Sequence, residues 1–278
     1  MPPLWLIFPE LSQGSTAWMT GYGKYYAIEF WKWLNELVPD ERIQYQTMFP
    51  APKTWRGFYD EFNERGLDKR EFRKYFLHGV QLWNKNDEMQ YSKDEITSQQ
   101  KLDLEFVNFW HNGDDHFNSQ WQISDFLVDT HRYFCTEQYM IAEKARVFRD
   151  RKRRMKIMET TNLMEMKALG RKVKKFRSKT WDKMKYSVVL NANYYKFSQN
   201  KEMRNRLLNI NDRVIVEANP TDIIWGIGLA KNDSEASNPK VWLGLNLLGF
   251  ALMEVRDEIR KVYQNYDKIN WDQFEKYR

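Results

Sequence analysis

Cysteine is almost absent from this chain of 278 residues, in which Cys135 is the single example. One cysteine excludes an internal disulfide framework, which fits a reducing compartment. Long apolar runs are absent too: the segment Leu4 to Phe8 is far too short to span a membrane, and no basic residue precedes it. We therefore expect a cytoplasmic protein with no membrane partner and no targeting segment.

The positive charges of the chain are unevenly distributed. The net charge is +6, yet residues 144–185 contain 17 lysines and arginines against four acids, an excess of 13 positive charges. The rest of the chain is therefore net acidic. A run of this kind is typical of a solvated helix face and equally of a surface that binds anions such as phosphate.

The first hundred residues carry aromatic side chains at helical spacing, and prolines punctuate them. The positions at this spacing include Tyr26, Phe30, Trp33, Phe58, Phe62, Phe72 and Phe76. The polar stretch at 84–100 suits a linker or an exposed helix. We predict a helical N-terminal extension at 1–100, which would bind a protein partner if its aromatic side chains are exposed.

The pattern changes at residues 104–265, which we predict to be one domain followed by a C-terminal tail at 266–278. Extended segments are predicted at 105–110, 124–134 and 213–218, and helices at 136–158, 161–169, 180–197 and 245–263, with Gly170 ending the second helix. The fold class is therefore α+β, mainly α-helical with a small β-sheet. No repeat has the period of a solenoid.

Two features that suggest a metal site or a nucleophile have simpler explanations. HNGDDH at 111–116 combines turn-forming residues at a spacing that matches no metal motif with a known mechanism. Cys135 has no identifiable neighbouring base and is typical of a small buried hydrophobe. We expect no metal and no cofactor.

Glu137 is an unusual residue for its position in YFCTEQYMIAEKARVF at 133–148. On a helix it would share a largely apolar face with Met140, Ile141 and Phe148, together with one cation, Lys144. A carboxylate in such surroundings has a raised pKa. That property suits a catalytic acid or base and also one half of a buried ion pair.

The segment NPTDIIWGIGLAKNDSEASNPKVWLGLN at 219–246 combines Trp225, Gly226 and Gly228 with Asn246 at the start of a predicted helix. The backbone amides of such a loop can approach a phosphate at a helix N-terminus. Glycines and tryptophans also mark ordinary turns that pack against a core.

Several ordered motifs resemble the YbiA-like NADAR family. The stretch SQWQISDFLVDTHRYFCTEQYMIAEKA at 119–145 is similar, without a gap, to the family's opening motif, and Glu137 falls on the family's glutamate. The similarity continues through LGR (169–171), KFSQN (196–200), IVEANPTDIIWGIGL (215–229), WLGLNLLG (242–249) and LMEVR (252–256), and covers about residues 104–260. Gln138 stands where a histidine is usual and Gln120 where an asparagine is common, so the substrate contacts at these two positions are undetermined.

The resemblance implies hydrolysis of an N-glycosidic bond in a nucleotide-like compound. Glu137 would be the catalytic carboxylate that stabilises positive charge on the ribose. Trp225 would contact the base or the ribose, and Asp222 would bind ribose hydroxyls or orient Arg171. The predicted substrate-binding residues are Lys144, Arg171, Asp222, Trp225, Gly226, Gly228 and Asn246, with the two cations and the glycine loop at a diphosphate.

Family members act on two kinds of substrate, and both remain possible for this chain. We expect removal of ADP-ribose from guanine bases in DNA, because the basic segment favours a polyanionic partner such as an ADP-ribosylated nucleic acid. The alternative is a nucleotide-like small molecule, a phosphorylated early intermediate of riboflavin synthesis. A non-catalytic module that binds ADP-ribose or modified DNA is the rival of another class, and it would not need Glu137.

Overall fold

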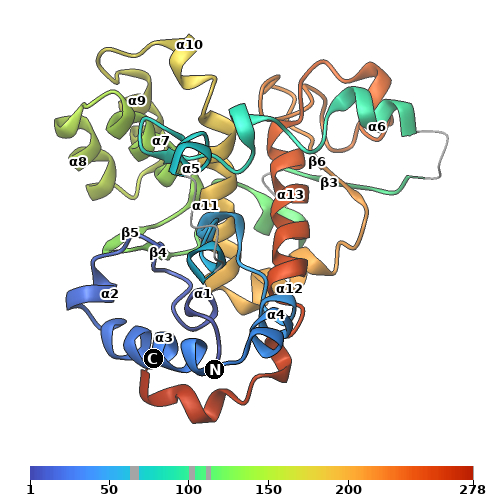
Figure 1. Cartoon of the computed structure of the whole chain (residues 1–278). Helices are drawn as coiled ribbons and strands as arrows, with labels where there is room; N and C mark the ends of the chain where they lie inside the picture. The colour runs from blue at the N-terminus through green and yellow to red at the C-terminus, as the bar shows by residue number, and fades with distance from the viewer. Residues whose placement is uncertain (63–68, 100–103, 111–113, 278) are drawn as a thin grey trace.

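Two helices that are buried on nearly every side form the centre of the molecule (Figure 1). The computed structural model describes residues 1–62, 69–99, 104–110 and 114–277. Helix α11 (Lys185–Gln199) and helix α13 (Leu247–Val262) pack against each other there. Thirteen residues of each helix are buried, including polar ones such as Lys196 and Glu254, which form hydrogen bonds there.

The other elements surround this central pair. On one side lie α7 (Thr136–Val147), α8 (Arg151–Glu159), α9 (Leu163–Arg171) and α10 (Ser178–Trp181), and on the other lie β3 (Phe106–Phe109), β6 (Val214–Glu217) and α12 (Lys201–Leu208) (Figure 1). The predicted mainly helical α+β class is confirmed. Within the described ranges, no helix is long and apolar enough to cross a membrane.

The short strands form three separate pairs in the described part of the chain. Strands β3 and β6 run parallel, with Phe106 opposite Val214 and Phe109 opposite Glu217. This pair confirms the extended segments predicted at 105–110 and 213–218. The predicted segment at 124–134 is instead a hairpin of β4 (Phe126–Val128) and β5 (His131–Tyr133), in which Asp129 adopts a left-handed turn conformation with φ 53°.

The single helix predicted at 136–158 is wrong, because the chain breaks it into α7 and α8. Arg149 has φ 58°, outside the helical range. Asp150 follows as the N-cap of α8, where its carboxylate accepts a hydrogen bond from the Arg153 N–H at 3.2 Å. The helix predicted at 180–197 is broken in the same way, because α10 ends at Trp181 and α11 begins at Lys185.

Gly170 does not end a helix as predicted but lies inside α9. A Cβ atom at Gly170 would lie 2.8 Å from Cγ2 of Ile141 on α7. Glycine is therefore explained by the close approach of α9 to α7 and not by a helix C-terminus. This approach brings α7 and α9 together along the wall of the site described below.

The N-terminal extension is helical, as predicted. It contains α1 (Leu4–Ile7), α2 (Ala17–Thr20), α3 (Lys24–Glu36), α4 (Pro39–Met48), α5 (Lys69–Arg73) and α6 (Lys93–Gln99). Phe76 differs from the prediction, because it lies in β1 (Phe76–Leu77), which pairs with β2 (Val80–Gln81), and not on one helix with Phe72. Trp5, Phe30 and Trp83 belong to the same continuous core as residues of α11 and α13.

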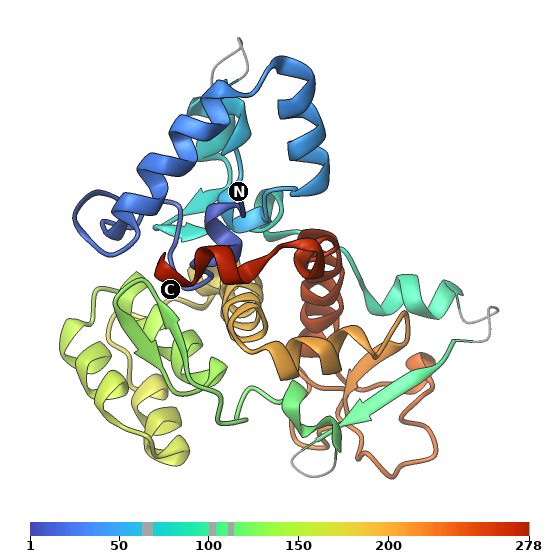
Figure 2. The ribbon, with the colours of Figure 1, turned by 90° about the horizontal axis from the view of Figure 1, so that it is seen from below.

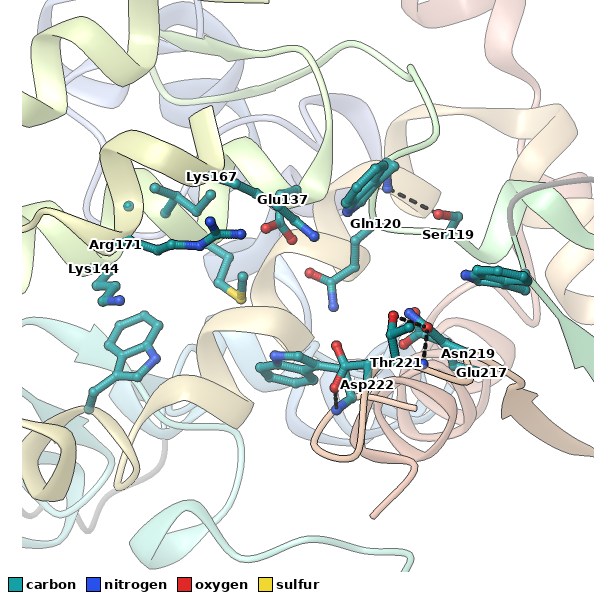
Figure 3. A pocket seen from close by; sticks show the side chains of 17 residues that line it. Ser119, Gln120, Glu137, Lys144, Lys167, Arg171, Glu217, Asn219, Thr221 and Asp222 are labelled. Atoms are coloured by element: carbon teal, nitrogen blue, oxygen red, sulfur yellow. Dashed lines mark hydrogen bonds between the residues drawn. The ribbon is translucent and has the colours of Figure 1, made fainter. Parts of the chain in front are cut away.

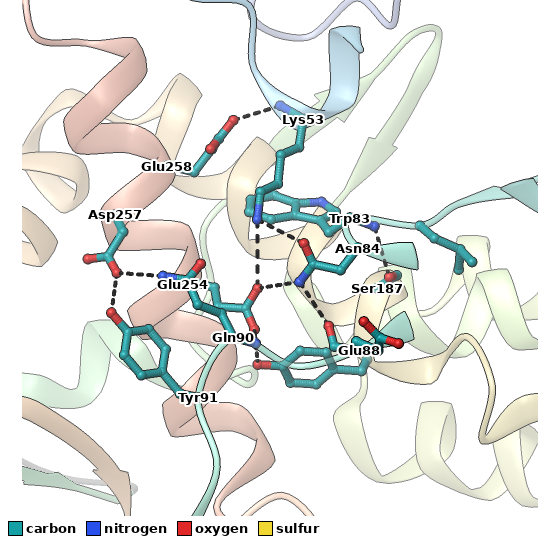
Figure 4. Close-up of polar contacts among 12 residues, drawn as sticks. Lys53, Trp83, Asn84, Glu88, Gln90, Tyr91, Ser187, Glu254, Asp257 and Glu258 are labelled. Atoms are coloured by element: carbon teal, nitrogen blue, oxygen red, sulfur yellow. Dashed lines mark hydrogen bonds and ion pairs between the residues drawn. The ribbon is translucent and has the colours of Figure 1, made fainter. Parts of the chain in front are cut away.

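Polar contacts attach the extension to α13 (Figure 4). Glu254 accepts a hydrogen bond from the Gln90 N–H at 2.6 Å, and Glu258 accepts one from the Lys53 N–H at 2.6 Å. Asp257 accepts a further bond from the Tyr91 hydroxyl. The polar stretch is therefore anchored to the central helix, and most described aromatic side chains of the extension are buried or partly buried, with Tyr22, Tyr25 and Phe76 exposed. The boundaries at 1–100, 104–265 and 266–278 remain predictions.

The C-terminal residues fold back onto the extension. The 3₁₀ segments Tyr266–Lys268 and Trp271–Tyr277 follow α13, and the rings of Tyr277 and Tyr26 lie 4.9 Å apart, edge to face. The two ends of the chain are therefore close together, as Figures 1 and 2 both show. This contact closes the core at the face remote from the site.

Candidate active site

A cavity of about 370 Å³ opens between α7, α9 and the segment that follows β6 (Figure 3). Its lining is unusually polar and combines carboxylates, cations, amides and tryptophans. The residues are Trp110, Ser119, Gln120, Trp121, Glu137, Met140, Ile141, Lys144, Lys167, Gly170, Arg171, Trp181, Glu217, Asn219, Thr221, Asp222 and Trp225. Segments that are more than a hundred residues apart in sequence therefore meet at one site.

The start of α7 is joined to the loop at 117–121 by backbone contacts. The carbonyl oxygen of Gln120 accepts hydrogen bonds from the Glu137 N–H at 3.1 Å and from the Thr136 hydroxyl at 3.3 Å. Glu137 lies in the first helical turn, whose N–H groups have no partner within the helix. These contacts fix the side chains of Gln120 and Glu137 beside each other in the cavity.

A buried lysine of α11 forms hydrogen bonds with the backbone of this loop. The Nζ of Lys196 donates to the carbonyl oxygens of Phe117 at 2.6 Å and Ser119 at 3.2 Å. Burial lowers the pKa of Lys196 to about 7. Lys196 lies in the KFSQN stretch, but the sequence did not indicate that its side chain supports the site.

We expect Lys196→Met to loosen the loop at 117–121. Methionine keeps the volume but leaves the two carbonyl oxygens without their donor, which costs about 1–3 kcal/mol for each buried group. Urea unfolding measures the loss of stability, and the rate of turnover should also fall because Gln120 and Glu137 lose their common support. Lys201→Met, at an exposed position of α12, is the matched control. Unchanged stability and turnover in Lys196→Met would show that the loop does not depend on this lysine.

Glu137 combines deep burial with a nearby positive charge. Its side chain faces the cavity from α7, and burial raises its pKa to about 7. The cations Lys167 and Lys144 oppose this rise, while the carboxylate of Asp222 adds to it. A carboxyl group that titrates near neutral pH can act as a general acid or base.

Glu217 is a second carboxyl group of the cavity that was not predicted as a site residue. It ends β6, and its N–H donates to Oδ1 of Asn246 at 3.0 Å. Its pKa is raised to about 8, chiefly by burial and also by the charges of Asp222 and Glu137, while a hydrogen bond from Asn219 and the charge of Lys167 oppose the rise. In the described part of the chain, the buried Oε2 of Glu217 has no hydrogen-bond partner. A carboxylate at the end of an apolar strand, within the IVEANP motif, was the signal that could have identified it.

The two carboxyl groups are coupled, because the charge on Glu137 raises the pKa of Glu217. Coupled groups titrate as a pair with macroscopic pKa values. Near neutral pH, one member of such a pair can be ionised while the other keeps its proton. The cavity therefore offers a base and an acid at the same time.

Cations gather at the other side of the cavity. Figure 3 shows Lys144 and Arg171 at one end and Glu217 and Asn219 at the opposite end, with Glu137 between them. The Nζ of Lys144 lies 4.2 Å from the ring of Phe176, a residue that does not line the cavity. Burial lowers the pKa of Lys144. Arg171 is exposed at the rim. The cavity is thus positive at one end and acidic at the other.

Asp222 and Trp225, two of the predicted substrate-binding residues, both line the cavity. Oδ1 of Asp222 accepts hydrogen bonds from the N–H groups of Ile224 and Trp225, both at 2.8 Å. Asp222 therefore stabilises the turn that presents the half-buried Trp225 ring to the cavity. Its second carboxylate oxygen forms no hydrogen bond within the described ranges, so a ligand hydroxyl can donate a hydrogen bond to it.

Gly226, Gly228 and Asn246 do not contribute to the lining of this cavity. Gly228 has φ 72°, and a Cβ at Gly226 would lie 2.8 Å from the carbonyl oxygen of Glu217, so both glycines are required by the backbone. The fully buried Asn246 bonds Glu217 N–H and donates to the carbonyl oxygen of Ile215 at 2.9 Å. The structure therefore gives these residues a role in holding Glu217 and the loop, and their contact with substrate stays a prediction.

The two glutamines that depart from the family pattern have different surroundings. Gln138 points away from the cavity: its side chain accepts from the Phe134 N–H and donates to the carbonyl oxygens of Ile157 and Thr160. Gln120 projects into the middle of the cavity (Figure 3). Its buried Oε1 has no hydrogen-bond partner among the described residues. Of the two, only Gln120 is placed to contact a ligand.

Residues of the HNGDDH stretch lie partly outside the described residues, since 111–113 are not among them. In the remainder, no group of three or more His, Cys, Asp or Glu side chains is placed to hold a metal ion. Cys135 is buried at the N-cap of α7, and burial raises the pKa of its thiol to about 11. A thiol with such a pKa is a poor nucleophile at neutral pH.

Comparison with known proteins agrees with the resemblance. Residues 107–260 match the family described as the NADAR domain. N-glycosidase R617 of Acanthamoeba polyphaga mimivirus is 41% identical over 148 residues, which cover 51% of this chain and 87% of the relative. Protein irg-1 of Caenorhabditis elegans is 38% identical over 162 residues, 55% of this chain and 74% of that protein. N-glycosidase YbiA of Escherichia coli (strain K12) is 31% identical over 157 residues, 55% of this chain and 88% of the relative.

The matched region contains the whole cavity, including both carboxyl groups and the cations. It spans more than half of the chain. This chain therefore belongs to the NADAR domain family and is a hydrolase that acts on N-glycosyl compounds.

Proposed function

We propose that this protein removes ADP-ribose from guanine bases in DNA by hydrolysing the N-glycosidic bond. The observation that carries the proposal is the polarised cavity: two carboxyl groups with raised pKa values at its centre and acidic end, and Lys144 and Arg171 at the other end. The bond to be broken would lie between the carboxyl groups, and the diphosphate would extend toward the cations.

The carboxyl groups divide the chemistry of hydrolysis between them. The bond between C1′ of the ribose and the nitrogen of the base breaks with its electron pair leaving on the base, and positive charge builds on the sugar. Glu137, as carboxylate, stabilises that charge and takes a proton from the water whose oxygen bonds to C1′. Glu217, as carboxylic acid, gives its proton to the departing nitrogen. Proton exchange with solvent restores both groups for the next turnover.

Other lining residues suit the two ends of the substrate. The indole of Trp225 offers a flat apolar face for a base or a ribose. Oε1 of Gln120, buried and without a partner in the described structure, can accept a hydrogen bond from an N–H group of a guanine base. The guanidinium of Arg171 can bind phosphate oxygens in a bidentate manner, and Lys144 adds a point charge.

The basic segment favours a nucleic-acid substrate over a small metabolite. Exposed cations continue beyond the cavity on α8, just after α9 and on α10, among them Lys152, Lys172 and Lys179. A surface of this charge attracts the phosphate backbone of DNA, and binding should weaken steeply with salt. A single phosphorylated metabolite would engage only the cations of the cavity itself.

The decisive experiment measures release of ADP-ribose from a single-stranded oligonucleotide that carries one ADP-ribosylated guanine. A parallel reaction uses the phosphorylated early intermediates of riboflavin synthesis. We expect release from the oligonucleotide, with kcat/KM well above that for the intermediates. Hydrolysis of the intermediates alone would replace the proposed substrate with the alternative. Binding of ADP-ribose without hydrolysis of either substrate would indicate a non-catalytic binding module.

A further inference from the structure

Another cavity lies at the turn between α7 and α8 and shares no lining residue with the active site. It has a volume of about 520 Å³, and its lining is four arginines and one alanine: Ala145, Arg146, Arg149, Arg151 and Arg154. We call it the arginine cavity. No acidic side chain contributes to this lining. The positive charges of neighbouring arginines repel one another, and an anion bound in this space would offset the repulsion.

Of the two neighbouring acidic residues, one pairs with an arginine of the lining and the other with an arginine outside it. Both carboxylate oxygens of Glu143 accept from Nε of Arg146 at 2.8 Å. Asp150 accepts from Nη1 of Arg153 at 2.8 Å, and Arg153 lies outside the lining. Among the described residues, no carboxylate lies within 4.0 Å of the side-chain nitrogens of Arg149, Arg151 or Arg154.

A further feature of the arginine cavity points to a ligand. The buried Nε of Arg154 has no hydrogen-bond partner within the part of the chain that the structure describes. Planar guanidinium groups match the oxygens of a phosphate better than lysine does.

The arginine cavity and the active site lie on different faces of α7. Lys144 lines the active site and Arg146 lines the arginine cavity, and two residues along a helix differ by about 200° in direction. Glu137 and Arg146, both on α7, are nine positions apart, roughly 14 Å along the helix axis. At about 3.4 Å for each phosphate of a stacked strand, this distance corresponds to about four nucleotides.

Exposed cations connect the two sites over the surface. Oδ2 of Asp150 accepts a hydrogen bond from the Lys174 N–H at 2.9 Å, which places the turn after α9 beside the arginine cavity. Lys172, Lys174 and Lys175 are exposed on that turn, and Arg171 immediately before them lines the active site. The row of positive charge is therefore continuous from the rim of the active site to the arginine cavity.

We propose that the arginine cavity binds the phosphate backbone of a nucleic-acid strand, about four nucleotides away from the nucleotide in the active site. The connecting row of cations favours an extended polyanion over a free phosphate compound, which would need the arginine cavity alone. The proposal goes beyond the glycosidase reaction, because it concerns binding of any strand, with or without a modified base.

The test compares two charge-matched double variants. Arg149→Gln/Arg151→Gln removes two exposed arginines of the arginine cavity, and Lys24→Gln/Lys32→Gln removes two exposed lysines of α3 as the control. Affinity for an unmodified, fluorescein-labelled single strand of twelve nucleotides is measured by anisotropy at several salt concentrations. We expect the slope of log K against log salt to fall by about 1.4 in the arginine variant, at about 0.7 for each lost phosphate contact, and to stay unchanged in the control.

Two outcomes would overturn the proposal. Equal slopes in the wild type and in both variants would show that no phosphate of the strand is held there. Calorimetric titration with inorganic pyrophosphate tests the other source of a phosphate ligand. If the wild type binds pyrophosphate and the arginine variant does not, while the slope for the strand is the same in both, the cavity binds a free phosphate compound instead of a strand. Turnover of a single modified nucleotide should be the same in all three proteins. Failure of the strand experiment is therefore distinct from failure of the glycosidase proposal.

Discussion

Glu137→Gln is expected to lower kcat by about a thousandfold or more while substrate binding is retained. Glutamine has the shape of the glutamate side chain but neither accepts a proton from water nor stabilises the charge on the ribose. General acid–base catalysis by one residue contributes about 10²–10⁴ to the rate, and the electrostatic role of Glu137 adds to this. The measurement is single-turnover release of ADP-ribose from the modified oligonucleotide, with the dissociation constant of the variant measured on the same substrate.

The control for this experiment is Glu159→Gln, an exposed position at the end of α8 that should retain full activity. Release at an undiminished rate by Glu137→Gln would make this carboxylate structural. An equal loss of affinity and of rate would indicate ground-state binding and not catalysis.

Glu137→Gln should also stabilise the fold at alkaline pH. The pKa of Glu137 is about 7 in the folded protein, against 4.5 as the ordinary value, so the folded state holds the proton more tightly. The contribution of protonated Glu137 to the free energy of unfolding is fully present below pH 4.5 and is lost as the pH rises through 7. Relative to the wild type, Glu137→Gln should therefore gain up to about 3 kcal/mol between pH 4 and pH 8 in the free energy of unfolding. Urea unfolding at both pH values measures the gain and also excludes misfolding as the cause of lost activity.

Glu217→Gln is expected to lower kcat by about a hundredfold and to change the shape of the pH–rate profile. In the wild type, activity needs Glu137 ionised and Glu217 protonated, so the profile should rise and then fall, with macroscopic pKa values near 7 and 8. Glutamine at 217 has no proton to give, so the falling limb should disappear. The rising limb should stay near pH 7, because Glu217 is protonated and therefore neutral in the pH range where Glu137 titrates.

A change of leaving group tests the assignment of Glu217 as the acid. A substrate whose base departs as a more stable anion needs less protonation, so the rate penalty of Glu217→Gln should shrink for it. The penalty of Glu137→Gln should stay the same, because positive charge on the ribose develops with either leaving group. A falling limb that persists in Glu217→Gln would assign the acid to another group, and an equal penalty on both substrates would do the same.

Local pattern was sufficient to identify much of the fold and part of the site. Periodicity predicted the helix at 245–263, which the structure confirms as α13, and apolar runs predicted β3 and β6. The predicted helix at 136–158 failed because its break depends on one residue, Arg149, in a conformation that a periodic pattern does not show. Gly170 was mistaken for a helix end because its cause is a contact with Ile141, a residue of another helix.

The sequence by itself determined the mainly helical class, the unusual setting of Glu137 and the basic segment at 144–185. These features depend on residues that are close together along the chain, where side-chain spacing and composition act directly. Only the tertiary structure decided that Glu217 faces the same cavity as Glu137, that Lys196 supports the loop of Gln120, and that the glycines at 226 and 228 lie outside the lining. Burial and charge coupling raise the pKa values of the two carboxyl groups. Both depend on distances in space between residues 80 positions apart, and no local pattern contains those distances.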